Sequence, residues 1–195
     1  MTKKYVWYVA YGSNLCRARF MAYIEGGLFP GNGRTYKGCS DKSPPLQDKP
    51  FLVPYEMYFG NEAASWDGMG VAFLDADKPG IALGRAYLIT EEQFYDVQEQ
   101  EGAFDEWYGR IVELHNEAGD IPYKTFTSRI RRPEKSPGKK YLDVIFKGLN
   151  ETYPQFVLYN DIRRQQSRKT PPRMARNLAA KNKLRQTTRK IVKIS

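Results

Sequence analysis

The segment Tyr11-Gly12-Ser13-Asn14-Leu15 is the first candidate for chemistry, because it follows directly on a run of strand-forming residues. A strand that leads through Gly-Ser-Asn into a helix presents successive backbone N–H groups and the positive end of the helix dipole. Gly12 would let a ligand approach the main chain closely. The segment therefore indicates an anion-binding turn. The alternative is a turn in which Ser13 or Asn14 only caps the following helix.

Glu101 is the second candidate, in the sequence Glu-Gln-Glu-Gly that ends at Gly102. Most carboxylates around it are expected to lie on a solvated helix face. Glu101 differs because a backbone bend at the glycine can turn it toward Phe94 and Val97. A carboxylate held in apolar surroundings can accept and return a proton at neutral pH. The position thus suggests a general acid/base, with the solvated helix face as the alternative.

Other catalytic systems find little support in the composition. The single histidine, His115, falls in a predicted strand, where histidines are more often structural. Ser13 is not in a G-x-S-x-G nucleophile elbow. Cys16 and Cys39 form no C-x-x-C pair, which favours reduced thiols over a disulfide or a zinc site. We therefore expect neither a metal nor a cofactor.

Several predicted elements must position these residues. The run 5–11 is apolar without alternation, which is typical of a central strand buried on both faces. A helix follows, and residues 26–54 are rich in glycine and proline, so we expect a long irregular excursion there. Thr90 begins a helix with a capping box formed with Gln93. The remaining predictions are strands at 55–60, 68–76, 82–90, 108–115 and 121–128 and an amphipathic helix at 139–149.

The net charge of +9 is unevenly distributed along the chain. Residues 161–195 hold 12 of the 31 basic and 1 of the 22 acidic residues, a net +11, which leaves a net −2 for residues 1–160. This predicts a body at 1–160 and a basic extension at 161–195. Such an extension suits an acidic protein partner, RNA or an anionic surface, or is simply solvated. No run is apolar enough to span a membrane, so a cytoplasmic location is expected.

Four motifs in order resemble the gamma-glutamylcyclotransferase-like family over roughly residues 5–130. They are Tyr11–Leu15 after a strand, the stretch from Phe59-Gly60 to Trp66–Ala72, the strand Gly84–Ile89, and Glu-Gln-Glu-Gly ending at Gly102. The resemblance implies an α+β fold, a small mixed β-barrel with flanking helices. It further implies that the main chain of Tyr11, Gly12, Ser13, Asn14 and Leu15 holds the α-carboxylate and other polar parts of a γ-glutamyl group, with Glu101 as acid/base.

The reaction implied by this resemblance is release of 5-oxoproline and a free amine or amino acid from a γ-glutamyl amide. Phe126 falls where the family often has an assisting aromatic hydroxyl, with Tyr123 nearby as a substitute. Hence Phe126 joins the expected substrate-binding residues, and the partner is a small γ-glutamyl molecule. The other hypothesis is a non-catalytic binding module of the same fold, with the basic tail contacting RNA, an anionic surface or an acidic protein.

Overall fold

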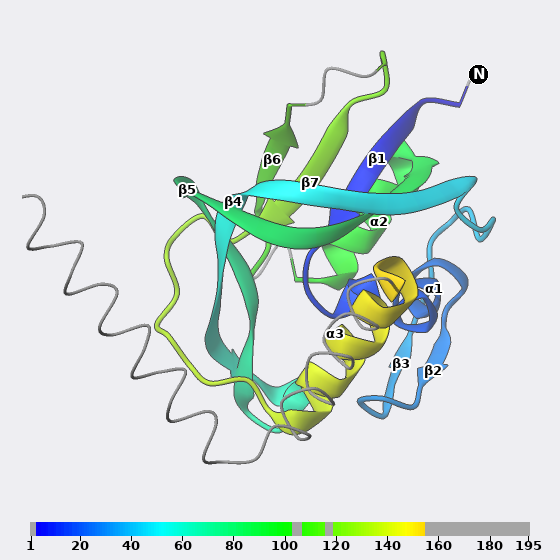
Figure 1. Cartoon of the computed structure of the whole chain (residues 1–195). Helices are drawn as coiled ribbons and strands as arrows, with labels where there is room; N and C mark the ends of the chain where they lie inside the picture. Colours follow the sequence, from blue (N-terminus) through cyan, green and yellow to red (C-terminus); the bar gives the residue numbers. More distant parts are fainter. Residues whose placement is uncertain (1–2, 103–106, 116–118, 155–195) are drawn as a thin grey trace, which may run out of the picture. The chain divides into compact units, whose positions relative to one another are not determined.

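The computed structural model describes residues 3–102, 107–115 and 119–154, and the compact unit that they form spans Met1–Tyr153 (Figure 1). Its strands are β1 (Tyr5–Ala10), β2 (Gly27–Phe29), β3 (Arg34–Tyr36), β4 (Gln47–Ala63), β5 (Met69–Thr90), β6 (Arg110–Leu114) and β7 (Tyr123–Thr127). Its helices are α1 (Arg17–Glu25), α2 (Glu91–Gln100) and α3 (Lys139–Thr152), with short 3₁₀ turns η1 (Ser13–Leu15) and η2 (Ala64–Trp66). The predicted basic extension at 161–195 lies outside the described residues.

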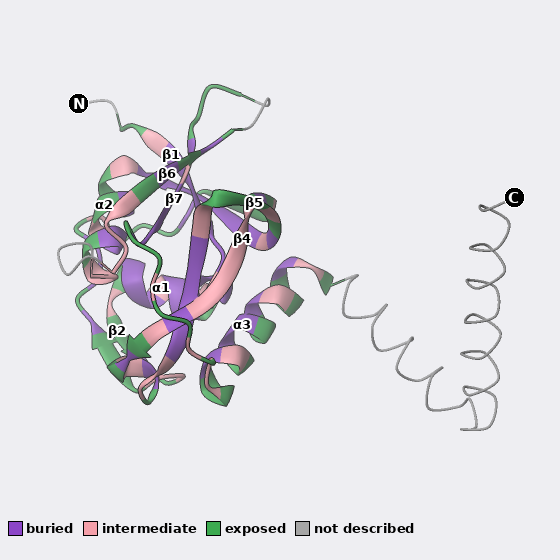
Figure 2. Cartoon of the chain, turned by 90° about the vertical axis from the view of Figure 1, so that its left-hand side faces the viewer, coloured by how far each residue is buried: buried purple, intermediate pink, exposed green. Residues whose placement is uncertain are grey.

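Five strands form one mixed sheet in the order β4-β5-β1-β7-β6. The central strand β1 pairs antiparallel with β5 and parallel with β7, and its residues 6–10 are all buried. Figure 2 shows the buried residues gathered along these inner strands. The predicted α+β class, with a mixed sheet and flanking helices, is confirmed, as is the central position of the first strand.

The prediction of irregular structure over residues 26–54 was wrong in two places, because β2 and β3 pair near its start and β4 begins at Gln47. Pro50 and Pro54 lie within this strand, although a proline cannot donate a hydrogen bond to a neighbouring strand. They are tolerated because β4 is an edge strand, bonded on one side to β5. The sequence signal for a loop was therefore a signal for a sheet edge.

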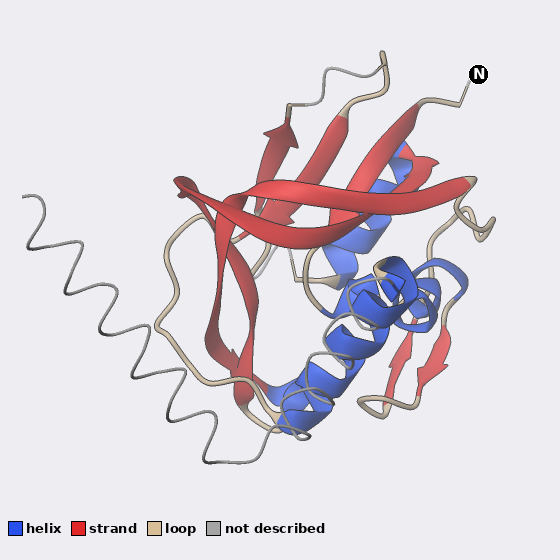
Figure 3. Cartoon of the chain, viewed as in Figure 1, coloured by secondary structure: helices blue, strands red, loops and turns tan. Residues whose placement is uncertain are grey.

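The strands predicted at 68–76 and 82–90 are two arms of the single long strand β5. Its pairing with β4 shifts register around Tyr55, between the Val53–Ala82 and Glu56–Asp75 pairs. Such a shift bends both strands together, and Figure 3 shows the pair changing direction. The bend carries one arm along β1 and the other arm past the start of α3.

Residues 40–43, in the middle of the 26–54 segment, are hydrogen-bonded to α2. The Ser40 N–H donates to Asp96 Oδ2 (2.7 Å). Gln93 Nε2–H₂ donates to the carbonyls of Asp41 (2.9 Å) and Ser43 (2.8 Å). Gln93 also completes the predicted capping box with Thr90 at the helix start, which is confirmed. These bonds fix the position of α2 against the rest of the unit.

Helix α3 presents Tyr141, Val144, Ile145 and Gly148 to the interior, while its other face is exposed. Gly148 touches the chain at Leu15 and Cys16 so closely that no Cβ would fit there. The helix predicted at 139–149 is thus confirmed, and it packs directly on the turn that follows β1. No helix in the described part of the chain is long and apolar enough to cross a membrane.

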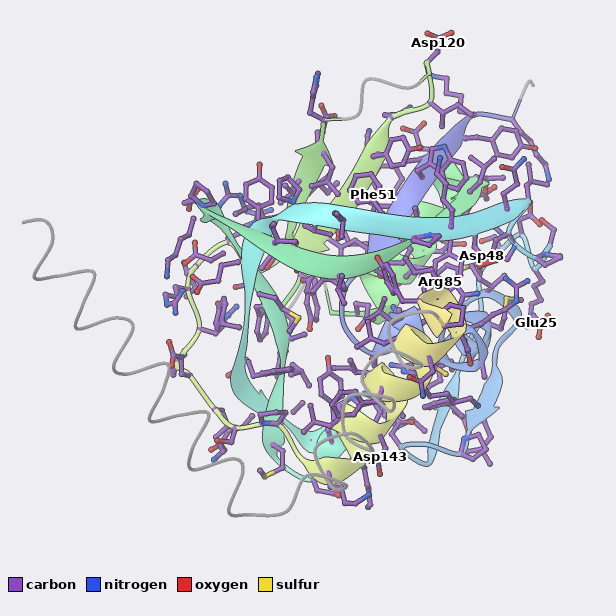
Figure 4. The ribbon with its side chains drawn as sticks, in the orientation of Figure 1. Glu25, Asp48, Phe51, Arg85, Asp120 and Asp143 are labelled. Atoms are coloured by element: carbon purple, nitrogen blue, oxygen red, sulfur yellow. The ribbon has the colours of Figure 1, made fainter. Side chains whose placement is uncertain are left out.

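A buried arginine ties the same elements together from the side of β5. Arg85 pairs with Asp48 of β4 (2.5 Å) and with Glu151 of α3 (2.9 Å), and its Nη1–H₂ also donates to the Leu15 carbonyl (3.1 Å). Figure 4 shows Arg85 and Asp48 close together above α3. The turn at residues 13–15 is therefore held by both a close helix contact and an ion pair network.

Candidate active site

The turn after β1 is a 3₁₀ turn rather than the cap of a helix. The Leu15 N–H donates to the Gly12 carbonyl (3.0 Å) and the Cys16 N–H to the Ser13 carbonyl (3.1 Å). Helix α1 begins only at Arg17, and Cys16 is its N-cap residue. The alternative that Ser13 or Asn14 caps the helix was therefore wrong, because the inserted turn moves the helix start along the chain and leaves the Asn14 side chain free for other contacts.

Glu101 lies at the end of α2, where the sequence placed it. It is the C-cap residue, its N–H donates to the Val97 carbonyl (3.0 Å), and Gly102 follows with a left-handed φ of 85°. A glycine in this conformation ends a helix and redirects the chain. A carboxylate at a helix C-terminus faces the negative end of the helix dipole, which is unfavourable without a compensating donor.

Asn14 supplies that donor. Its Nδ2–H₂ donates to Glu101 Oε1 at 2.8 Å, although the two residues are 87 positions apart in the sequence. The same group also lies 3.2 Å from the hydroxyl of Tyr8. The two segments that the sequence singled out are thus brought into direct contact, and Asn14 fixes the orientation of the carboxylate.

A cavity of about 280 Å³ opens over this contact. Its lining includes five of the predicted substrate-binding residues, namely Tyr11, Gly12, Ser13, Asn14 and Phe126, together with Glu101. Leu15 is absent from the lining, since it is buried under α3. The volume is slightly below the roughly 300–1,000 Å³ of sites for drug-sized ligands, so the cavity suits a molecule no larger than a small peptide.

Phe126 reaches the cavity from β7, where its ring stacks on Tyr8 with centroids 5.1 Å apart. It has no hydroxyl, and its carbonyl accepts a hydrogen bond from the Tyr11 hydroxyl (2.9 Å). Tyr123 does not replace it, because its ring stacks on Trp7 and Phe51 and does not line the cavity. Residues 123 and 126 are three apart on one strand, so they point to opposite faces of the sheet.

Four phenols other than Tyr11 line the cavity, and they remain protonated at neutral pH. Burial, followed by the charge of Glu101, raises the pKa of Tyr8 and of Tyr23 well above the usual range. Burial is also the main cause at Tyr108, whose pKa is well above its usual range, and at Tyr141, whose pKa is raised to about 12. These hydroxyls can exchange hydrogen bonds with a ligand, but they are not bases.

Glu101 is the one carboxylate among the described lining residues. The described lining also contains no histidine or cysteine, since His115 is exposed after β6 and both cysteines are buried outside the cavity. Among the described lining residues, Glu101 is therefore the candidate general acid/base. The arrangement can move a proton between two atoms of a ligand that lies against Asn14 and Glu101.

Sequence reasoning missed two cations and several aromatic residues at this site. Arg19 on α1 and Arg34 on β3 both line the cavity. Arg19 lies four residues before Tyr23 on the buried face of α1, and an arginine at such a position is itself a signal. Arg34 carried no signal, because it lies in the excursion that the sequence described only as irregular.

No family model matches the chain. It is 32% identical over 194 residues to the protein named Histone deacetylase 5 of Arabidopsis thaliana; the match covers 77% of this chain but 29% of that protein, so the chain spans less than a third of its length. Among solved structures, it resembles one named gamma-glutamyl cyclotransferase (TM-score 0.57, 18% identity, 76% of this chain and 80% of that chain).

Two further solved structures have the same fold. One is an uncharacterized protein from Homo sapiens (TM-score 0.56, 19% identity, 77% of this chain and 82% of that chain). The other is YkqA from Bacillus subtilis (TM-score 0.55, 21% identity, 85% of this chain and 55% of that chain). At these identities the likeness shows the fold, and the chain accordingly has the gamma-glutamyl cyclotransferase fold.

Proposed function

We propose that this chain is a gamma-glutamylcyclotransferase-type enzyme that releases 5-oxoproline and a free amine or amino acid from a γ-glutamyl amide. The observation that carries the proposal is the 2.8 Å hydrogen bond from Asn14 to Glu101, made inside a cavity of about 280 Å³. It joins the polar turn after β1 to a carboxylate that can move a proton. The shared fold with a structure named gamma-glutamyl cyclotransferase supports the same activity.

The chemistry needs little beyond positioning. The α-amine of the substrate attacks its own γ-carbonyl carbon, a new C–N bond closes a five-membered ring, and the original amide C–N bond breaks. Glu101 takes a proton from the α-ammonium group and returns it to the departing amine, so protons balance and no water is consumed. Binding the substrate in a folded conformation makes the attack intramolecular, which alone accounts for several kcal/mol of the barrier.

Each side of the cavity has a role in this scheme. The turn from Tyr11 to Asn14 contacts the polar groups of the glutamyl part. Glycine at position 12 lets this turn approach Tyr141, because a Cβ there would lie 2.9 Å from the Tyr141 hydroxyl. Phe126 and the buried phenols exclude water from the ring-closing atoms. Asn14 holds Glu101 in the position from which it reaches the α-amine.

The test is to incubate the protein with a panel of γ-glutamyl dipeptides and γ-glutamyl amines and to measure 5-oxoproline. Glu101→Gln keeps the shape of the side chain but removes its basicity, and should lower the rate at least about 10²-fold. Glu99→Gln is the matched control, since Glu99 is exposed two residues away and pairs with Lys37 (2.8 Å). Full activity of Glu101→Gln contradicts its role, and no release from any compound by the wild type contradicts the function.

The second candidate is a non-catalytic binding module that uses the same fold. It is favoured by the match to a much longer protein, in which a sequence like this one is one part of a larger chain. The basic residues of 161–195 would then dock on an acidic protein, RNA or an anionic surface, with a steep dependence on salt. A deletion of residues 161–195 that leaves such binding intact would contradict this assignment.

A further inference from the structure

Arg19 has an unusual environment for a buried cation. It lies on α1 with 3% of its surface exposed, and it lines the cavity that contains Glu101. Its Nη2–H₂ donates to the Tyr23 hydroxyl (2.5 Å), but its Nε–H and Nη1–H₂ are buried and have no hydrogen-bond partner among the residues that the structure describes. Buried charges are normally paired and buried donors normally satisfied, so these groups require an explanation.

The surroundings hold the guanidinium in place without a direct ion pair among the described residues. Its central carbon lies 4.1 Å from the ring centroid of Tyr23 and 4.3 Å from that of Tyr36. Within the described residues, no carboxylate lies within 4.0 Å of Arg19 to form an ion pair. Aromatic stacking fixes the plane of the guanidinium, and Nε–H and Nη1–H₂ remain as donors on either side of Nη2, so a ligand carboxylate can accept a charge-assisted hydrogen bond from one of them.

Asn14 supplies the complementary unfilled group. Its Nδ2–H₂ is used by Glu101, whereas its Oδ1 is buried and accepts no hydrogen bond from a described residue. Arg19 and Asn14 both line the cavity, and each has a buried polar atom that no described residue bonds. A ligand that bonds both residues carries a carboxylate for Arg19 and an ammonium group for Asn14 and Glu101.

We propose that Arg19 is the specificity-determining residue of this site and binds a carboxylate group of the substrate. The inference rests on the proposed function, in which a γ-glutamyl dipeptide has two such groups, the α-carboxylate of the glutamyl part and the carboxylate of the departing amino acid. A ligand without the carboxylate leaves the Arg19 donors unpaired in the cavity. Because charge-assisted hydrogen bonds are the strongest class, the preference for the carboxylate should be roughly 10- to 100-fold.

The decisive experiment measures binding, so that it does not depend on turnover. By calorimetry, 5-oxoproline is compared with 2-pyrrolidinone, which has the same ring without the carboxylate. The wild type should bind 5-oxoproline more tightly, and Arg19→Gln should lose most of this preference while its affinity for 2-pyrrolidinone changes little. Arg17→Gln is the matched control, because it makes the same charge change on the same helix at a residue that does not line the cavity.

Rate measurements with two substrates then identify which carboxylate Arg19 binds. A γ-glutamyl alkylamine carries only the α-carboxylate, so a rate loss in Arg19→Gln with both this compound and a γ-glutamyl dipeptide assigns Arg19 to the α-carboxylate. A loss with the dipeptide alone assigns it to the departing amino acid, and in that case the preference for 5-oxoproline does not depend on Arg19. The proposal is overturned when Arg19→Gln keeps both the ligand preference of the wild type and its rates with both compounds.

A second Arg19 variant and the 5-oxoproline assay distinguish a loss of folding, a failure of the carboxylate site and a failure of the proposed function. Arg19→Lys keeps the charge but not the planar guanidinium, so it should retain only part of the preference if Arg19→Gln is too unstable to purify. A wild type that shows the Arg19-dependent preference but releases no 5-oxoproline would refute the proposed function and support the carboxylate site. Turnover in which both Arg19 variants keep the wild-type preference and the wild-type rates would support the proposed function and refute the carboxylate site.

Discussion

Replacing Gly148 with alanine tests how α3 positions the turn at the cavity. A Cβ at this position would lie 2.6 Å from Leu15 Cβ, and closer still to the Leu15 carbonyl carbon and the Cys16 nitrogen. The two backbone atoms would lie 2.3 Å away and ordinary contacts begin near 3.4 Å, so helix and turn must separate by about 1.1 Å. Two of the three close atoms belong to the backbone, and no side-chain rotation can relieve the clash.

Two opposing effects decide the sign of the stability change. Alanine in a helix interior is favoured over glycine by roughly 1 kcal/mol. Overpacking of a close contact typically costs about 1–3 kcal/mol, and here the movement would also strain the Arg85 bond to the Leu15 carbonyl. We expect the clash to prevail, with the free energy of unfolding lower by roughly 1–2 kcal/mol. The displaced turn carries Asn14, so the rate of 5-oxoproline release should fall at least about 10-fold.

Urea unfolding and the 5-oxoproline assay measure these two effects. Asn150→Ala is the matched control, because Asn150 is exposed in the same helix and its replacement raises helix propensity by roughly 0.5 kcal/mol without a clash. It should be neutral or slightly stabilising, with unchanged activity. A Gly148→Ala protein that gains about 1 kcal/mol and retains full activity would refute the close packing of α3 on the turn.

Two other predictions concern stability. Burial raises the pKa of Tyr141 to about 12. The unfolded chain loses the Tyr141 proton near pH 10, whereas the folded chain keeps it. The free energy of unfolding is therefore unaffected by this group below about pH 10 and falls by roughly 1.4 kcal/mol per pH unit up to about pH 12. Urea unfolding against pH should show a shallower decline in Tyr141→Phe, and an identical decline would contradict the assignment. Arg85→Gln leaves Asp48 and Glu151 without their cation and should lower the free energy of unfolding by roughly 2–4 kcal/mol. The control Arg110→Gln removes an exposed ion pair and should lower it by less than about 1 kcal/mol. Equal losses of stability in the two variants would mean that the buried network adds nothing.

Local sequence signals predicted the pieces of the site accurately. Thr90 and Gln93 specified the start of α2, and Gly102 specified its end, so Glu101 could be placed at the helix terminus without any tertiary information. These signals work because caps and glycine turns depend on residues only three or four positions apart. The buried, non-alternating run of β1 was equally sufficient to identify a central strand.

Other features depended on neighbours distant in the sequence. Pro50 and Pro54 read as loop residues, and only the edge position of β4 makes them compatible with a strand. Asn14 was a plausible helix cap until the tertiary structure placed it against Glu101. In each case one residue suits two local conformations, and the long-range partner selects between them.

The sequence by itself thus determined the fold class, the central strand, the polar turn at Gly12 to Asn14 and the position of Glu101 at a helix end. Only the tertiary structure decided that the turn and the carboxylate meet, that Arg19 lines the same cavity, and that Tyr123 lies elsewhere. The physical reason is that capping and periodicity are local properties of the chain, whereas a cavity is formed by side chains from several elements and exists only once those elements have packed.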